Sequence, residues 1–197
     1  MALYNAGRDQ QAVQTLLACL PLFEPYEQRN REFLALCVNL GAALTECGQS
    51  AAAEDALGKA LQIVCLLGDE MAQARAHFNL GNLARQSNSR QSCHHHYLQV
   101  ITCATHVSIA AKHLQASCCL NLSQLLLSMR QLAAARERLQ QLDPLLPAAE
   151  RDAELRWSLH MQQGHLALQE QHLVSARASF VQALAIAQAA GQPGYVA

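Results

Sequence analysis

Two polar runs near the middle of the chain carry side chains that could do chemistry. Cys93 is followed by three consecutive histidines, and thiolate and imidazole are the side-chain ligands that zinc prefers. The other run is Asn79-Leu-Gly-Asn82, and a side-chain amide offers both a donor and an acceptor to the backbone of a bound peptide. The first run raises the question of a metal site, and the second that of a peptide-binding surface.

The spacing of the histidines argues against a metal site. Consecutive residues on a helix point about 100° apart, whereas two ligands on one helix need a spacing of three or four residues. Only Cys93 and His96 have that spacing, and an ion needs three or four converging ligands. We therefore expect a buried Cys93 with a packing role, histidines on an outer helix facing solvent or a loop, and no metal or other cofactor.

The helices that position these side chains recur along the chain. Small residues stand 40, 42 and 41 positions apart, and each is followed by a second small residue after twelve positions and by a bulky one four positions later. The four sets are Gly41, Ala53 and Leu57; Gly81, Cys93 and Tyr97; Ser123, Ala135 and Leu139; and Gly164, Ala176 and Phe180. This periodicity predicts helical hairpins whose two helices meet at the paired small residues.

Short breaker segments separate the helical segments, at residues 47–50, 87–89, 129–131 and 170–172 within the hairpins and at 21–25, 67–69, 143–147 and 191–194 between them. There are no β-branched runs that would predict strands. The sequence therefore predicts an all-α fold, a solenoid of antiparallel helix hairpins. A single array is expected over 1–197, with a partial repeat at 1–25, repeats at 26–67, 68–107, 108–149 and 150–191, and the start of a further repeat or a linker at 192–197.

The recurring small and bulky residues resemble the tetratricopeptide repeat (TPR). The resemblance covers almost the whole chain, although the period is about 41 residues instead of the usual 34 or so. Cys37, His77, Cys119 and His160 stand where the family often has Trp, and Ser123 replaces Gly. The resemblance implies that the hairpins stack into a right-handed superhelical solenoid and that the first helix of each hairpin lines a concave groove. Because neither end has a polar capping helix, we expect a fragment of a longer protein and possible self-association through the repeat ends.

Composition excludes several classes of function. The 197 residues are 51% apolar with a net charge of −1, which gives no general attraction to nucleic acid or to an anionic membrane. No uninterrupted apolar run of 18 residues predicts a membrane span. Eight cysteines lie in helical patterns without a Cys-x-x-Cys pair, which favours reduced thiols and a cytoplasmic location. No nucleophile has a histidine and an acid at a recognisable spacing, so we expect no enzyme activity.

The residue two positions before each small residue of the first helices is an amide: Asn39, Asn79, Asn121 or Gln162. In TPR arrays of the polarity-scaffold and kinesin-light-chain types, asparagines at similar positions clamp the extended backbone of a partner. The residues expected to bind a partner are Asn39, Arg75, Phe78, Asn79, Asn82, Arg85, Asn121, Gln124, Gln162 and His165. The arginines favour an acidic group in that partner. Alternatively, the asparagines are structural spacers that hydrogen-bond neighbouring helices.

These features predict a non-catalytic scaffold that binds an extended, partly acidic segment of a partner protein, with no direct contact to nucleic acid or membrane. The alternative is the sensory or regulatory array of a larger signalling protein or transcription regulator, which binds a small ligand or controls self-association. Residues 183–197 resemble the repeat junctions of maltose-regulator-type activators. A neighbouring DNA-binding or catalytic domain would favour this alternative.

Overall fold

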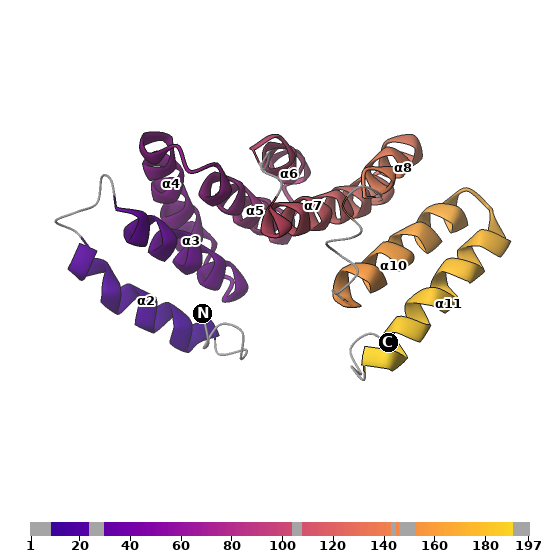
Figure 1. Ribbon diagram of the computed structural model, residues 1–197, viewed down its shortest axis with the longest axis horizontal. Helices are drawn as coiled ribbons and strands as arrows, with labels where there is room; N and C mark the ends of the chain where they lie inside the picture. Colours follow the sequence, from indigo (N-terminus) through magenta and orange to yellow (C-terminus); the bar gives the residue numbers. More distant parts are fainter. Residues whose placement is uncertain (1–8, 24–29, 104–107, 143–144, 146–152, 191–197) are drawn as a thin grey trace. The chain divides into compact units, whose positions relative to one another are not determined.

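The computed structural model describes residues 9–23, 30–103, 108–142, 145 and 153–190, and all regular secondary structure in these residues is helical (Figure 1). In chain order the α-helices are α2 (Asp9–Phe23), α3 (Arg31–Glu46), α4 (Ser50–Leu67), α5 (Glu70–Gln86), α6 (Arg90–Cys103), α7 (Ile109–Ser128), α8 (Leu132–Gln140), α10 (Ala153–Gln169) and α11 (Leu173–Ala190). Within each of the two units described below, successive helices pack in sequence order, as in a helical repeat. The all-α prediction is confirmed for the described residues.

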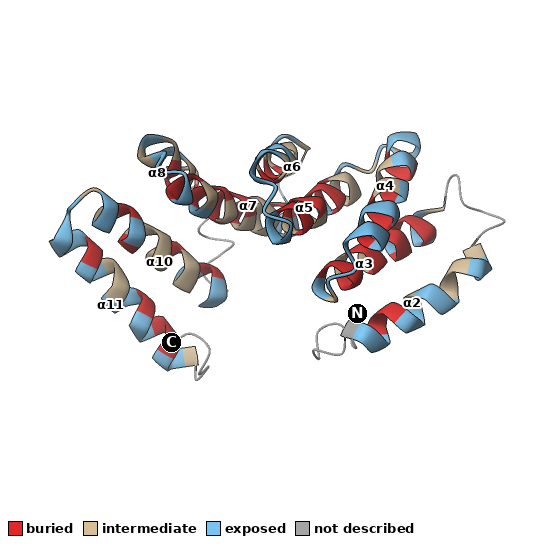
Figure 2. Cartoon of the chain, turned by 180° about the vertical axis from the view of Figure 1, so that it is seen from behind, coloured by how far each residue is buried: buried red, intermediate tan, exposed pale blue. Residues whose placement is uncertain are grey.

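The packing divides the chain into two compact units, residues 1–105 and 106–197. The first unit contains α2 and the hairpins α3–α4 and α5–α6, and the second contains the hairpins α7–α8 and α10–α11. In the first unit, apolar residues of α2 to α5 form the buried core. In Figure 2, buried and exposed stretches alternate along α10 and α11, as expected for helices that turn one face to a core.

The same tight turn joins the two helices of every hairpin. One residue in each turn has a left-handed backbone, with φ of 72° at Gly48, 55° at Asn88, 56° at Arg130 and 63° at Gln171. The amide of the next residue donates to a carbonyl five residues back: Gln131 N to Leu126 O is 2.9 Å. This is the bonding pattern of the Schellman motif, which satisfies carbonyl groups at a helix end. The spacing of the four turns repeats the spacing of the small residues.

Substituting Arg130 by Gly is expected to stabilise the protein. A left-handed backbone is unfavourable for a residue with a Cβ atom by roughly 1–2 kcal/mol, and the greater freedom of glycine in the unfolded chain offsets part of the gain. We expect the free energy of unfolding in urea to rise by about 0.5 kcal/mol. The control is Ser128→Gly, inside the last turn of α7, which should lower it by a similar amount. A lower value for Arg130→Gly would contradict the assignment of this turn.

The glycines of the first helices lie under bulky side chains of the second helices. A Cβ atom on Gly81 would be 2.5 Å from Cε1 and 2.6 Å from Cδ1 of Tyr97. The three such pairs are Gly41 with Leu57, Gly81 with Tyr97, and Gly164 with Phe180. The sequence predicts that each glycine meets the small residue of the second helix, but the nearest atoms belong to the bulky residue one turn later. The glycine is needed because the large side chain fills the space that a Cβ atom would take.

Among the described residues, one helix has the length and apolar composition of a membrane span, although none is expected from the sequence. It is α11, of whose 18 residues 22% are buried. Its buried residues are Ala176, Ala183, Ile186 and Ala187, and the helix packs along α10. A helix in the core of a soluble protein can have the same composition, so length and composition alone do not make α11 a span.

Candidate functional site

A cleft of about 220 Å³ lies between α3 and α5, the first helices of the two consecutive hairpins of the first unit. Its apolar lining includes Leu34, Val38 and Met71, and its polar lining consists of Arg31, Asn39, Asp69 and Arg75. Asn39 and Arg75 are two of the residues that the sequence assigns to partner binding. The cleft is therefore where the structure brings members of that predicted set together.

The helix starts place the polar residues of the cleft on one face. Asn30 caps α3, because its Oδ1 accepts hydrogen bonds from the amides of Glu32 at 2.8 Å and Phe33 at 3.3 Å. The cap makes Arg31 the first residue of α3, two turns before Asn39 and on the same side. Asp69 caps α5 in the same way. The local sequence thus fixes where both helices begin and which residues face the cleft.

The charge of the cleft is mainly positive. Arg31 and Arg75 are exposed, and within the described residues neither guanidinium forms an ion pair. Asp69 is the one acidic residue in the lining, and its Oδ1 already accepts the amide of Ala72 at 3.0 Å. A guanidinium pairs with a carboxylate in a fixed two-pronged geometry. The cleft is therefore suited to a carboxylate from another molecule.

Asn79 has a structural role as well as a place on the predicted binding face. Its Nδ2 donates to the carbonyl of Val38 at 3.3 Å, which joins α5 to α3. A comparable bond joins α10 to α7 in the second unit, where Gln169 Nε2 lies 3.5 Å from Leu127 O. The amide nitrogen of Asn79 thus has the role of a structural spacer between helices, which is the alternative given above. Its amide oxygen takes no part in this bond.

Phe78 and Asn82 contact the second helix of their own hairpin. The hydroxyl of Tyr97 donates to Asn82 Oδ1 at 2.6 Å, and the ring centroids of Phe78 and Tyr97 are 6.1 Å apart. Arg85 is exposed and lies near enough to Cys93 to affect that thiol. None of these three residues lines the α3–α5 cleft. Phe78 and Asn82 therefore stabilise the hairpin, and the binding surface that we propose does not include them.

The remaining four residues of the predicted set belong to the second unit. Asn121 and Gln124 lie on α7, and Gln162 and His165 lie on α10. The first residue of each pair is half-buried and the second is exposed. The ring of His165 packs edge-on against Phe180 on α11, with centroids 5.3 Å apart. These residues lie outside the cleft, and their predicted role in binding stays a prediction.

Two polar residues of the cleft, Arg31 and Asp69, were not predicted from the sequence. Neither were its apolar residues, which are Met71, Leu34, Ala35, Val38 and Ala72. The signal was available, because the face that carries Asn39 and Arg75 continues toward the helix starts in steps of four residues. Two such steps before Asn39 lead to Arg31, and one step before Arg75 leads to Met71. Asp69 has the further signature of a capping residue just before a helix.

The histidine run departs from its predicted placement. Cys93 is buried, as expected, and burial raises the pKa of its thiol, with Arg85 opposing the shift. His95 is exposed, but His96 is half-buried and lies against His77 on α5, with 3.1 Å between the two Nδ1 atoms. The expectation that all three histidines face solvent or a loop is therefore wrong for His96. The expectation considered only residues on the same helix, whereas His96 contacts a residue of α5.

The geometry of His77 and His96 is that of a hydrogen bond. Their ring centroids are 5.4 Å apart, which exceeds the Nδ1–Nδ1 distance of 3.1 Å by about the diameter of an imidazole ring. The two nitrogens thus point straight at each other instead of converging on an ion beside them. Within the described residues, no three His, Cys, Asp or Glu side chains form a group that could hold a metal ion.

Burial and nearby histidines disfavour the charged forms of both His77 and His96. The pKa of His77 is lowered to about 4 by burial first, and then by His96 and His95. Burial also lowers the pKa of His96, as does His95, while Glu54 opposes the shift. The pair is therefore neutral at neutral pH, with one ring donating and the other accepting.

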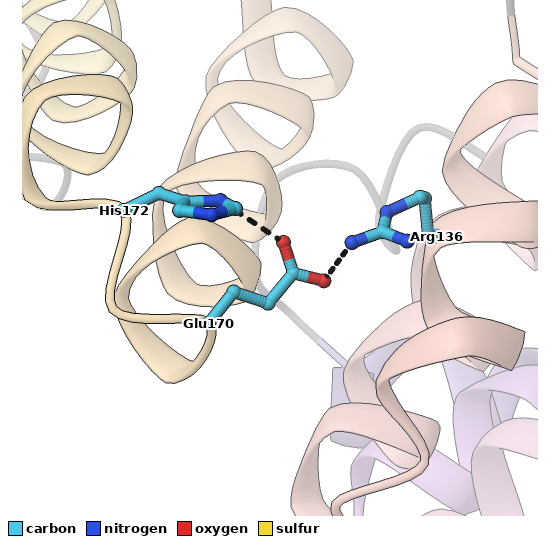
Figure 3. A network of polar contacts seen from close by, with 3 residues as sticks. All are labelled: Arg136, Glu170 and His172. Atoms are coloured by element: carbon cyan, nitrogen blue, oxygen red, sulfur yellow. Dashed lines mark hydrogen bonds and ion pairs between the residues drawn. The ribbon is translucent and has the colours of Figure 1, made fainter.

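A second cleft, of about 390 Å³, lies in the second unit among α8, α10 and α11. Figure 3 shows the carboxylate of Glu170 between the side chains of Arg136 and His172. Arg136 forms an ion pair with Oε1 of Glu170, and Nδ1 of His172 lies 3.6 Å from Oε2. The guanidinium of Arg136 is already paired with Glu170, so this cleft offers less free positive charge to a ligand than the α3–α5 cleft does.

All eight cysteines lie in the described residues, and none of them forms a disulfide. Comparison with known proteins adds no family for the chain: no protein-family model matches the sequence, and no curated protein matches it. The repeat and the α3–α5 cleft are therefore the features from which a function can be inferred.

Proposed function

We propose that the chain is a right-handed TPR-type array that binds an extended, acidic segment of a partner protein at the α3–α5 cleft. The four recurring turns and the glycines packed under bulky residues support the array. The observation that carries the binding role is a cleft that holds two arginines without ion pairs to the described residues, beside Asn39. We further propose that the protein acts in the cytoplasm.

The cleft is suited to one part of a peptide. Its volume of about 220 Å³ is below the roughly 300–1,000 Å³ of typical small-molecule pockets, so it accommodates a side chain or two instead of a whole ligand. Asn39 offers an amide that can hold a peptide N–H and C=O together. Arg31 and Arg75 can pair with a carboxylate, and Met71 contributes an adaptable apolar contact. These features favour a peptide over the small ligand of a sensory array.

A binding role fits the chemistry of the cleft better than catalysis does. A guanidinium cannot be deprotonated in a protein, so neither arginine can act as a general base. Oδ1 of Asp69 caps α5 by accepting the amide of Ala72. We therefore propose a scaffold without enzyme activity.

Selection of peptides from a random display library, with the 197-residue chain as bait, is expected to enrich extended acidic sequences. Arg75→Glu should weaken binding of a selected peptide by about tenfold or more, because it replaces a charge-assisted bond by repulsion. Fluorescence polarisation measures the dissociation constant.

The matched control is Arg90→Glu, which makes the same change at an exposed residue of α6 outside the cleft. It should leave the affinity for the peptide unchanged. Enrichment of basic or purely apolar peptides would count against the proposal, as would equal losses in the two variants.

A further inference from the structure

The last helix of the second unit, α11, is apolar on two opposite faces. Its buried face packs in the hairpin with α10. On the opposite face, Val174 is 86% exposed and Val181 54% exposed, and Ala178 and Ala185 between and after them are exposed too. These four residues, here termed the α11 outer face, recur at intervals of four, three and four positions. That spacing puts them in one straight row along the helix.

At one position of this row, that of Ala178, the other second helices carry ionisable residues. When the chain is aligned on its repeat, Ala178 corresponds to Asp55 on α4, His95 on α6 and Glu137 on α8. All three are exposed and ionisable. The position of Val174 is alanine in two of these helices, Ala51 and Ala133, and the position of Val181 is Leu98 in α6. What distinguishes α11 is thus Ala178, which joins the exposed apolar residues into one row without an ionisable side chain between them.

The order of the side chains makes this face complementary to itself. Along the row, large and small residues alternate as Val174, Ala178, Val181 and Ala185. If a second α11 lies antiparallel about a twofold axis at the centre of the row, Val174 faces Ala185 and Ala178 faces Val181. Every large side chain then meets a small one, as close packing requires. We propose that a second copy of this chain docks here, so that two α11 helices pair in antiparallel orientation.

The charges of α11 permit this pairing. Arg177 is the one charged residue in the helix, and it lies beside the row. In the antiparallel register it comes next to Leu184 of the second copy, whereas the two Arg177 side chains are separated by more than a helical turn. The aliphatic part of the arginine can thus cover Leu184, which is 43% exposed in the single chain.

The dimer should be weak. An α-helix of 18 residues is about 27 Å long and about 10 Å wide, so this face alone buries less than the roughly 800 Å² per partner of a standard interface. Association is therefore measured by sedimentation equilibrium over about a hundredfold range of concentration. The expected result for the 197-residue chain is a reversible monomer–dimer equilibrium.

Two variants test the register. Ala178→Val places a second valine opposite Val181 of the other copy, and the dissociation constant should rise about tenfold through overpacking. The double variant Ala178→Val, Val181→Ala exchanges large and small residues within the pair and should restore the original value to within about threefold. Because these positions are exposed in the monomer, circular dichroism should show the same helix content in all variants.

The control is Ala133→Val, an identical change at an exposed position of α8, which should leave the equilibrium unchanged. A chain that stays monomeric throughout would overturn the proposal. So would a dimer that Ala178→Val strengthens, which is the behaviour of a nonspecific apolar patch. Binding of the monomer to phosphatidylcholine vesicles, measured by flotation and abolished by Val181→Glu, would assign this face to a membrane surface and would also overturn it.

Discussion

The free energy of unfolding is expected to fall by about 2–3 kcal/mol when Gly81 is replaced by Ala. The added Cβ atom would lie 2.5 Å and 2.6 Å from two carbon atoms of the Tyr97 ring. That ring cannot easily give way, because it is fully buried and its hydroxyl is bonded to Asn82 at 2.6 Å. Urea denaturation followed by circular dichroism measures the loss.

Gly58→Ala is the matched control for this prediction. Gly58 also lies inside a helix, α4, but a Cβ atom added there would have no atom within 4 Å apart from those of its chain neighbours and of its own helix backbone. Alanine is a better helix former than glycine by about 1 kcal/mol, so this variant should be more stable than the parent. If the two substitutions had similar effects, the close packing of Gly81 under Tyr97 would be contradicted.

Acidification from about pH 6.5 to about pH 4 is expected to destabilise the first unit by about 2–3 kcal/mol. The pKa of His77 is lowered from its ordinary value of 6.5 to about 4 in the folded protein, so between these values the unfolded chain binds more protons. Stability is therefore fully present above pH 6.5 and is lost as the pH falls toward 4. Urea denaturation at several pH values measures the slope, in which His96 takes part.

His77→Leu should flatten this pH dependence. The corresponding position in two other repeats is an apolar thiol, Cys37 or Cys119, and both are buried, so leucine is compatible with the packing there. The control is His94→Gln, which removes a neighbouring histidine that does not contribute to the shift of His77. If the parent and His77→Leu lost stability in parallel between pH 6.5 and 4, another group would be responsible.

The helices and turns could be predicted from sequence because each repeat supplies an independent reading of the same pattern. Breakers such as Gly48 and Asn88 recur at the repeat spacing, and the left-handed turns lie at those positions. The side chain that packs over each glycine could not be predicted from this pattern. Spacing along the chain shows which residues share a helical face, but the direction in which a side chain leans decides which neighbour it covers.

Contacts between different helices account for what the sequence did not reveal about the candidate site. His77 and His96 are 19 residues apart, and a rule for ligands on one helix cannot detect their hydrogen bond. Asn39 and Arg75 were found because they lie near the recurring small residues. Arg31 lies two helical turns before Asn39 on α3. Its place in the cleft depends on how α3 packs beside α5.

Methyl NMR of methionine-labelled protein tests the proposed binding site most directly. Met71 lines the cleft, whereas Met129 and Met161 lie in the second unit. On titration with a selected acidic peptide, the Met71 methyl signal, assigned with Met71→Leu, should shift saturably in the parent protein and in Arg90→Glu but not in Arg75→Glu. Saturable shifts of Met161 or Met129 with an unmoved Met71 would contradict binding at the α3–α5 cleft.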